Sequence, residues 1–213
     1  RTLLGQGVVA RFDPETYSDA VAFARIGEGS LGGKARGLAF MNSMILKHRL
    51  YDKHANVRIM IPRSVVIATD YFDDFIRLNG LKYIISQEFS DEEILSEFVS
   101  STVPARLQQE LKAYIQTVRT PLAVRSSSKL EDSHYQPFAG IYSTYMIPYV
   151  DNGDQMLRLL LKAVKSVYAS VYFATSRAYL SSSQNLISEE KMAVIIQEVC
   201  GLSLIHISEP TRL

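Results

Sequence analysis

Residues 29–40 read GSLGGKARGLAF and place three glycines and a lysine in front of an apolar run with helical spacing. Glycine adopts positive φ without steric cost, so Gly32 and Gly33 are compatible with a plain tight turn. A glycine-rich loop that enters a helix also presents backbone N–H groups and the positive end of the helix dipole to an anion, and Lys34 adds a full charge. The stretch therefore predicts a helix over 35–48 that follows either a turn or a phosphate-binding loop.

Periodicity and helix-boundary residues predict helices and strands along the rest of the chain. The expected apolar face of 35–48 consists of Leu38, Met41, Met44 and Ile45. Pro62 interrupts an apolar run because it cannot donate to a central ladder, and Thr69 is expected to cap the next helix. Further helices are expected over 69–79, after the capping box at 90–93, after Pro104 and over 154–180, and strands over 57–61, 64–68, 121–128, 141–147 and 192–199.

The last of these strands, MAVIIQEV at 192–199, is nearly all apolar. This composition is typical of a strand that is buried on both faces. Because the strand pattern stops after it, we expect this strand to form an open apolar edge of the sheet.

Length and composition predict a globular chain with a sizeable core, since 47% of its 213 residues are apolar. The formal charge of +1 is too small to attract nucleic acid or an anionic membrane to the whole molecule, so any anion-binding site must be local. The single cysteine, Cys200, excludes an internal disulfide framework and a cysteine-rich zinc site. No apolar run approaches the ~18 residues that span a bilayer, and a cytoplasmic protein is the default expectation.

The two ends of the chain suggest a piece of a longer protein. It starts at Arg1 without an initiator methionine and closes on LSLIHISEPTRL. We expect 1–30 to be a lead-in from the longer protein and 31–201 to be the domain. Residues 202–213 resemble the translation of sequencing-adapter read-through and are expected to be a non-native tail, the alternative being an ordinary surface tail.

Three separated clusters each follow or precede an apolar element: GGK at 32–34, RSSS at 125–128 and QEV at 197–199. Together with IPRSVVIATDYFDDFI and LAVRSSSKLEDSHYQPFAGIYSTY, they resemble the nucleotide-binding domain of the phosphoenolpyruvate synthase and pyruvate phosphate dikinase family. The resemblance runs over 31–201. It implies an α+β fold of the ATP-grasp-like kind, incomplete at the C-terminus.

The resemblance also implies roles for two cations. Lys34 would hold ATP phosphates, the alternative being a solvated lysine at a helix start. Arg125 would reach the β and γ phosphates and act in catalysis by steadying charge during transfer. The alternative is that Arg125 forms an ion pair with Glu131 or Asp132. Both could be true if the carboxylates bind Arg125 until ATP arrives.

The remaining candidate residues are implied in the same way. Gly32 and Gly33 would belong to the phosphate loop, and Phe138, Ala139 and Gly140 would form a flexible loop over the phosphates or a plain hairpin turn. The backbone of Gln197, Glu198 and Val199 would read the adenine edge, so their side chains could change with little loss. Ser126 to Ser128 and Thr144 are weaker candidates, since hydroxyls near a strand end usually cap backbone groups.

Other parts of the family's chemistry have no counterpart that we can name in this sequence. In the family, the magnesium ligands follow the segment that corresponds to Gln197, Glu198 and Val199, and they stay unknown here. The histidines are His48, His54, His134 and His206, and none lies in the family's phosphohistidine motif. Cys200 carries no partner that would suggest a nucleophile.

The expected function is the ATP-binding part of a phosphoenolpyruvate synthase-like phosphotransferase, with ATP and Mg²⁺ as cofactors. ATP would pass its β-phosphate to a histidine on another domain, with release of AMP and phosphate, and pyruvate would receive the phosphoryl group. The chain alone would be inactive. The intact enzyme could form a homodimer. The alternatives are another acceptor, such as an antibiotic hydroxyl or a glucan, and a nucleotide-sensing module that transfers nothing.

Overall fold

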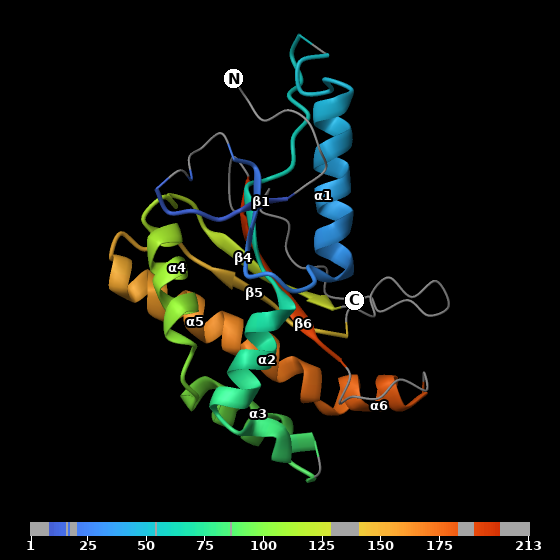
Figure 1. The fold of residues 1–213 in the computed structure, drawn as a ribbon, viewed down its shortest axis with the longest axis vertical. Helices are drawn as coiled ribbons and strands as arrows, with labels where there is room; N and C mark the ends of the chain where they lie inside the picture. The colour runs from blue at the N-terminus through green and yellow to red at the C-terminus, as the bar shows by residue number, and fades with distance from the viewer. Residues whose placement is uncertain are drawn as a thin grey trace.

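The structure is a computed structural model, which describes residues 9–15, 17, 21–53, 55–85, 87–128, 141–182 and 190–200. Its centre is a six-stranded sheet in the order β1-β2-β3-β6-β4-β5. Helix α1 covers one face of this sheet, and the other helices pack on the opposite face (Figure 1). The chain is thus a mixed α and β protein, as expected.

The sheet is parallel on one side and antiparallel on the other. The strands are β1 (Ala10–Arg11), β2 (Phe23–Ile26), β3 (Ser64–Ile67), β4 (Leu122–Ser128), β5 (Thr144–Ile147) and β6 (Met192–Glu198). The β1–β2 and β2–β3 pairs are parallel, whereas β6 is antiparallel to both β3 and β4. Strands β1 and β2 lie within 1–30, so the sheet begins before residue 31.

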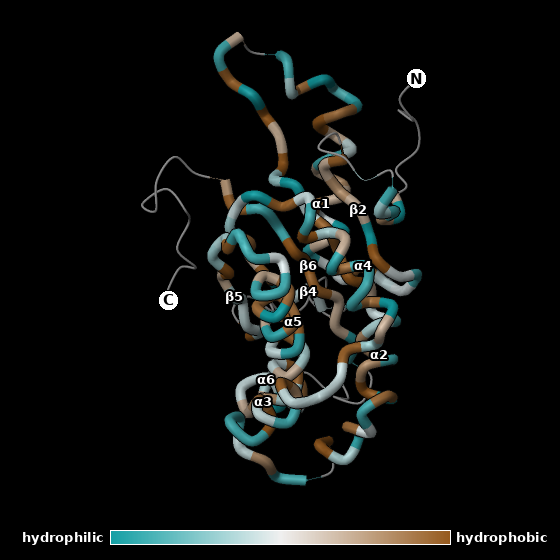
Figure 2. Tube along the Cα trace, turned by 90° about the vertical axis from the view of Figure 1, so that its left-hand side faces the viewer, coloured by the Kyte–Doolittle hydropathy of each residue, from teal (hydrophilic) through white to brown (hydrophobic). Residues whose placement is uncertain are grey.

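Strand β6 lies in the interior of the sheet, between β3 and β4. The expectation that 192–199 forms an open edge was therefore wrong, because hydrogen bonding to a strand on each side closes both of its edges. Its expected burial on both faces is confirmed for Met192 to Gln197. Figure 2 shows the hydrophobic colour along this strand.

The helical elements differ in detail from the expected ones. They are α1 (Gly32–Lys47), α2 (Thr69–Leu78), η1 (Leu81–Ile85), α3 (Asp91–Ser100), α4 (Ala105–Ile115), α5 (Gly153–Ala169), η3 (Ser170–Tyr172) and α6 (Ala174–Ser182). The capping box before α3 is confirmed, since Ser90 and Glu93 exchange both hydrogen bonds. The helix expected over 154–180 is divided, because Ser170 forms a 3-10 turn and Phe173 is extended.

Two further expectations were wrong at segment boundaries. Val57 makes only a single bridge and 58–63 form no strand, so the strand expected over 57–61 is absent from this described segment. Thr69 is the first residue of α2 and not its cap, which is Ala68. The Thr69 hydroxyl instead accepts a hydrogen bond from the Ser30 N–H at 3.0 Å.

Each sheet face has its own apolar core. The larger core joins the sheet to α2, α3, α4 and α5, with Phe75 packed against Phe98 and Tyr168 at ring distances of 5.7 and 5.5 Å. The smaller core lies under α1, where Ala35 is buried and Leu38 and Ile45 are partly buried. Met41, which was expected on the buried face, is 49% exposed, so that expectation was wrong for this residue.

Helix α1 meets β4 at an unusually close backbone contact. Gly32 has a φ of 70°, and a Cβ at this position would lie 1.9 Å from the carbonyl oxygen of Ser127. The Ser127 hydroxyl accepts from the Ala35 N–H at 3.0 Å and donates to the Leu31 carbonyl at 2.7 Å. The N-cap residue, Leu31, provides no side-chain cap. The Ser30 hydroxyl accepts from the Gly32 N–H at 3.3 Å, and Ser127 satisfies the Ala35 N–H from another element.

We expect Gly32→Ala to lower the free energy of unfolding for two reasons. The left-handed conformation alone costs an alanine roughly 1–2 kcal/mol. The new Cβ must also displace the Ser127 carbonyl, so the total loss should be larger than this. Gly37→Ala is the matched control in the same helix, since a Cβ there meets nothing within 4 Å. It should be neutral or stabilising by up to about 1 kcal/mol. Urea unfolding measures both variants, and equal midpoints would show that the contact does not constrain the fold.

Candidate functional site

The fold brings together the three clusters that sequence analysis separated. Strands β4 and β6 are neighbours, with Ala123 opposite Gln197 and Arg125 opposite Ile195. The first turn of α1 packs on the same β4 through Gly32 and Ser127. GGK and RSSS therefore meet at the start of α1, whereas QEV pairs with the other end of β4, at Leu122 and Ala123.

Lys34 lies in the first turn of α1 and reaches β4. Its Nζ donates to the Ser126 hydroxyl at 3.2 Å, next to Arg125 in the strand. The first turn of α1 contains no acidic residue. Lys34 thus contributes an ammonium group to β4 from the start of α1, at the residue that follows Arg125.

Arg125 is half-buried at the middle of β4, where Thr144 of β5 lies opposite it. Its Nη1 donates to the Gln197 Oε1 at 3.2 Å. Thr144 is exposed. Glu131 and Asp132, the alternative partners of Arg125, lie outside the described residues, so that ion pair stays a prediction.

The turn before α1 is tied to the start of α2, a connection that sequence analysis missed. The Asp70 carboxylate accepts from the N–H groups of Glu28 and Gly29 at 2.9 and 3.0 Å. A Cβ on Gly27 would lie 2.6 Å from the same carboxylate. The sequence shows an acidic residue, Asp70, in the first turn of a predicted helix and a glycine-rich turn at 27–33. No local sequence pattern indicates that these two segments are in contact. Asp70 therefore fixes the turn that leads into α1.

The expected adenine-reading segment has its backbone donors engaged. The Glu198 N–H donates to the Arg63 carbonyl at 2.8 Å, and the Val199 N–H donates to the Pro121 carbonyl at 2.9 Å. The Glu198 carboxylate pairs with Arg63 at 3.3 Å, and both side chains are largely buried. This segment is therefore part of the sheet, and backbone N–H donors of Glu198 and Val199 do not point to a ligand.

Several expected site residues cannot be placed. Phe138, Ala139 and Gly140 lie outside the described residues, as do His54, His134 and His206. His48, at the end of α1, and Cys200 are exposed. Among the residues that the structure describes, no group of three or more His, Cys, Asp or Glu side chains could hold a metal ion. The magnesium ligands thus stay unassigned.

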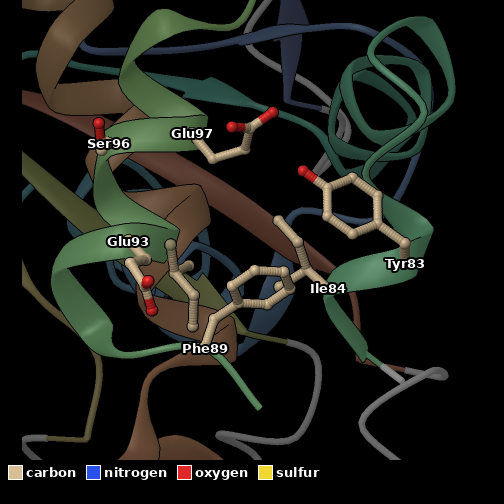
Figure 3. Close-up of a pocket in the computed structure, with 7 residues that line it drawn as sticks. Tyr83, Ile84, Phe89, Glu93, Ser96 and Glu97 are labelled. Carbon is tan, nitrogen blue, oxygen red and sulfur yellow. The ribbon is translucent and has the colours of Figure 1, made fainter. Parts of the chain in front are cut away.

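A pocket of about 300 Å³ lies between η1 and α3, with Tyr83, Phe89, Glu93 and Glu97 among its lining residues (Figure 3). Its carboxylates already have partners within the protein. Glu93 accepts from the Ser90 N–H at 2.8 Å, and Glu97 accepts from the Tyr83 hydroxyl. Burial and that hydrogen bond to Glu97 raise the pKa of Tyr83. Since α3 and α1 lie at opposite ends of the long axis (Figure 1), this pocket is separate from the α1–β4 region.

None of the helices in the described parts of the chain is both long and apolar enough to cross a membrane.

Comparison with known proteins gives two matches. The model of the family described as "Pyruvate phosphate dikinase, AMP/ATP-binding domain" matches residues 28–204. The uncharacterized phosphotransferase YvkC of Bacillus subtilis (strain 168) is 28% identical over 181 residues, which make up 84% of this chain and 19% of that protein. The chain therefore spans about a fifth of the length of this relative. The family match contains α1, β4 and β6, together with Asp70 and the two residues whose N–H groups it binds, Glu28 and Gly29. The chain belongs to the family of pyruvate phosphate dikinase AMP/ATP-binding domains.

Proposed function

We propose that the chain binds the phosphates of ATP where the first turn of α1 meets β4. The observation that carries this proposal is that β4 carries both Arg125 and Ser126, the residue that binds the Lys34 ammonium group. An ammonium group, a guanidinium group and a helix N-terminus are the groups that favour a triphosphate. Gly32 and Gly33 are buried, and Gly32 packs on the Ser127 carbonyl. The proposed phosphate contacts are therefore Lys34 and Arg125, with Thr144 and the Phe138, Ala139 and Gly140 loop as further contacts.

The roles of the two cations differ because their shapes differ. Lys34 offers a compact point charge at the end of a flexible stem, which suits a phosphate cluster of variable geometry. Arg125 offers a planar fork that can bind two phosphate oxygens together and steady the charge that moves during transfer. Arg125 is therefore the proposed catalytic residue, and Lys34 the proposed anchor.

We also propose that the fold is ATP-grasp-like and that adenine lies at the C-terminal end of β6. Because the Glu198 and Val199 N–H groups are engaged, adenine would be read there through carbonyl oxygens or through donors further along the chain. The described residues offer no group of three or more His, Cys, Asp or Glu side chains that could hold Mg²⁺.

The proposed reaction of the whole protein is that of a phosphoenolpyruvate synthase. ATP, pyruvate and water would give phosphoenolpyruvate, AMP and phosphate through a phosphohistidine on another domain. Pyruvate, the histidine and a homodimer rest on the family resemblance, whereas a cytoplasmic location is the default expectation from the sequence. A different acceptor and a non-catalytic nucleotide sensor remain the second and third candidates.

We expect Lys34→Met and Arg125→Met each to weaken ATP binding by about tenfold or more, because each removes a charge-assisted contact to phosphate. Adenosine, which lacks phosphates, should bind all variants alike. Lys47→Met, in the last turn of α1, is the control that removes a lysine elsewhere. Calorimetric titration with ATP and adenosine measures the effect, and unchanged ATP affinity in both test variants would refute the phosphate site.

We expect the chain alone to bind ATP without forming AMP when pyruvate is present, because the described residues place no histidine beside Arg125. Nucleotide chromatography after incubation with ATP, Mg²⁺ and pyruvate measures this. The full-length protein is the comparison, and pyruvate-dependent AMP release by it supports the synthase. Release of AMP by the chain alone would show that the phosphoryl acceptor lies within it.

A further inference from the structure

Gln197 is a largely buried amide in an otherwise apolar central strand. It is 9% exposed, and its neighbours in β6, such as Ile195 and Ile196, are fully buried. A polar side chain in such a position is unfavourable unless its donors and acceptors find partners. Gln197 finds them on both neighbouring strands, since its Nε2 donates to the Ser64 Oγ on β3 at 3.1 Å and its Oε1 accepts from Arg125 on β4 at 3.2 Å.

The direction of this hydrogen-bond chain is determined by its far end. The Ser64 hydroxyl donates to the Pro62 carbonyl at 2.9 Å, and a hydroxyl has only one proton. Toward Gln197 it can therefore only accept, so the amide nitrogen must face Ser64. The amide oxygen is left to face Arg125. The Pro62 carbonyl thus orients the Gln197 amide, through Ser64, so that its oxygen accepts from Arg125, two strands away from Ser64.

We propose that the side chain of Gln197 is a positioning residue for Arg125, which it holds without neutralising its charge. This inference rests on the proposed phosphate role of Arg125. A guanidinium has five N–H donors, and Gln197 uses one of them, which leaves donors for phosphate oxygens. Arg63 gives the contrast within the same sheet region, because it faces the Glu198 carboxylate in a largely buried ion pair. The proposal differs from the expectation that only the backbone of Gln197 matters.

The decisive variants are Gln197→Met, which keeps the shape but removes the acceptor, and Gln197→Glu, which replaces it with a carboxylate. Gln197→Met should bind ATP about tenfold more weakly, with unchanged adenosine affinity. Gln197→Glu should lose at least as much at neutral pH, since its carboxylate pairs with Arg125 and competes with phosphate. Gln108→Met, on the exposed surface of α4, is the matched control and should behave as the wild type.

The pH dependence separates positioning from a general structural effect. Protonation converts the introduced carboxylate of Gln197→Glu into a neutral acceptor that resembles the amide. The ratio of its ATP affinity to that of the wild type should therefore rise as the pH falls through the pKa of this carboxyl group. The same ratio for Gln197→Met should not depend on pH. A pH-independent defect in Gln197→Glu would overturn the proposal.

A second readout does not need ATP. The guanidinium N–H signals of Arg125 in the nitrogen-15 NMR spectrum of the free chain should shift and exchange faster with water in Gln197→Met, and to a lesser degree in Ser64→Ala. If the wild type fails to bind ATP, the proposed function is wrong, whatever the Arg125 signals show. If the wild type binds ATP and Gln197→Met leaves both ATP affinity and the Arg125 signals unchanged, the positioning role is wrong and the proposed function stands.

Discussion

The contact between Gly32 and the Ser127 carbonyl is the constraint on which the rest of the site depends. It permits α1 to approach β4 more closely than any side chain at position 32 would allow. At that separation the Ser127 hydroxyl reaches both Leu31 and Ala35, and Lys34 reaches Ser126. The glycine-rich turn therefore acts through packing as well as through any contact with phosphate. The two interpretations of GSLGGKARGLAF, a tight turn and a phosphate loop, are compatible with each other.

Hydrogen bonds between distant segments hold each part of the site. Asp70, at the start of α2, binds the backbone of the turn before α1. Gln197 connects β3 to β4 through its side chain. Arg63, which follows Pro62, pairs with Glu198 at the end of β6 and lies 5.2 Å from the ring centre of Tyr17. Apart from the exposed bond between Glu28 and Asp70, these bonds are buried or half-buried, so the site is supported by rigid elements on several sides.

Sequence analysis predicted well what local signals determine. The capping box at Ser90 and Glu93 was found where the pattern placed it. The helix predicted over 35–48 begins earlier, at Gly32, and the strand predicted over 192–199 ends one residue earlier, at Glu198. Sequence analysis failed where the determinant is distant in sequence. The interior position of β6 depends on pairing with β3 and β4, which no local pattern encodes. The break at Ser170 also escaped the helical periodicity, because the apolar spacing of α5 continues into η3 while the serine hydroxyl bonds to the Val167 carbonyl.

The site residues show the same division. The positions of Lys34 and Arg125 followed from motifs, and the structure brings both to β4. The side-chain role of Gln197 and the anchoring role of Asp70 did not follow, because each requires knowledge of which elements are neighbours. Phe138, Ala139 and Gly140 stay predictions.

The place of β6 in the sheet has a consequence for how the chain folds. The strand is the last of the six in sequence, yet it forms the bridge between the parallel strands and the β4–β5 pair. Until residues 192–198 are available, β3 and β4 have no common partner, and each leaves an apolar strand edge unpaired. The pairing of β3 with β6 closes a loop of more than a hundred residues, a contact order that favours slow folding. During synthesis the sheet is therefore completed late. Until then, the unpaired apolar strands of the partly made chain are open to association with other chains.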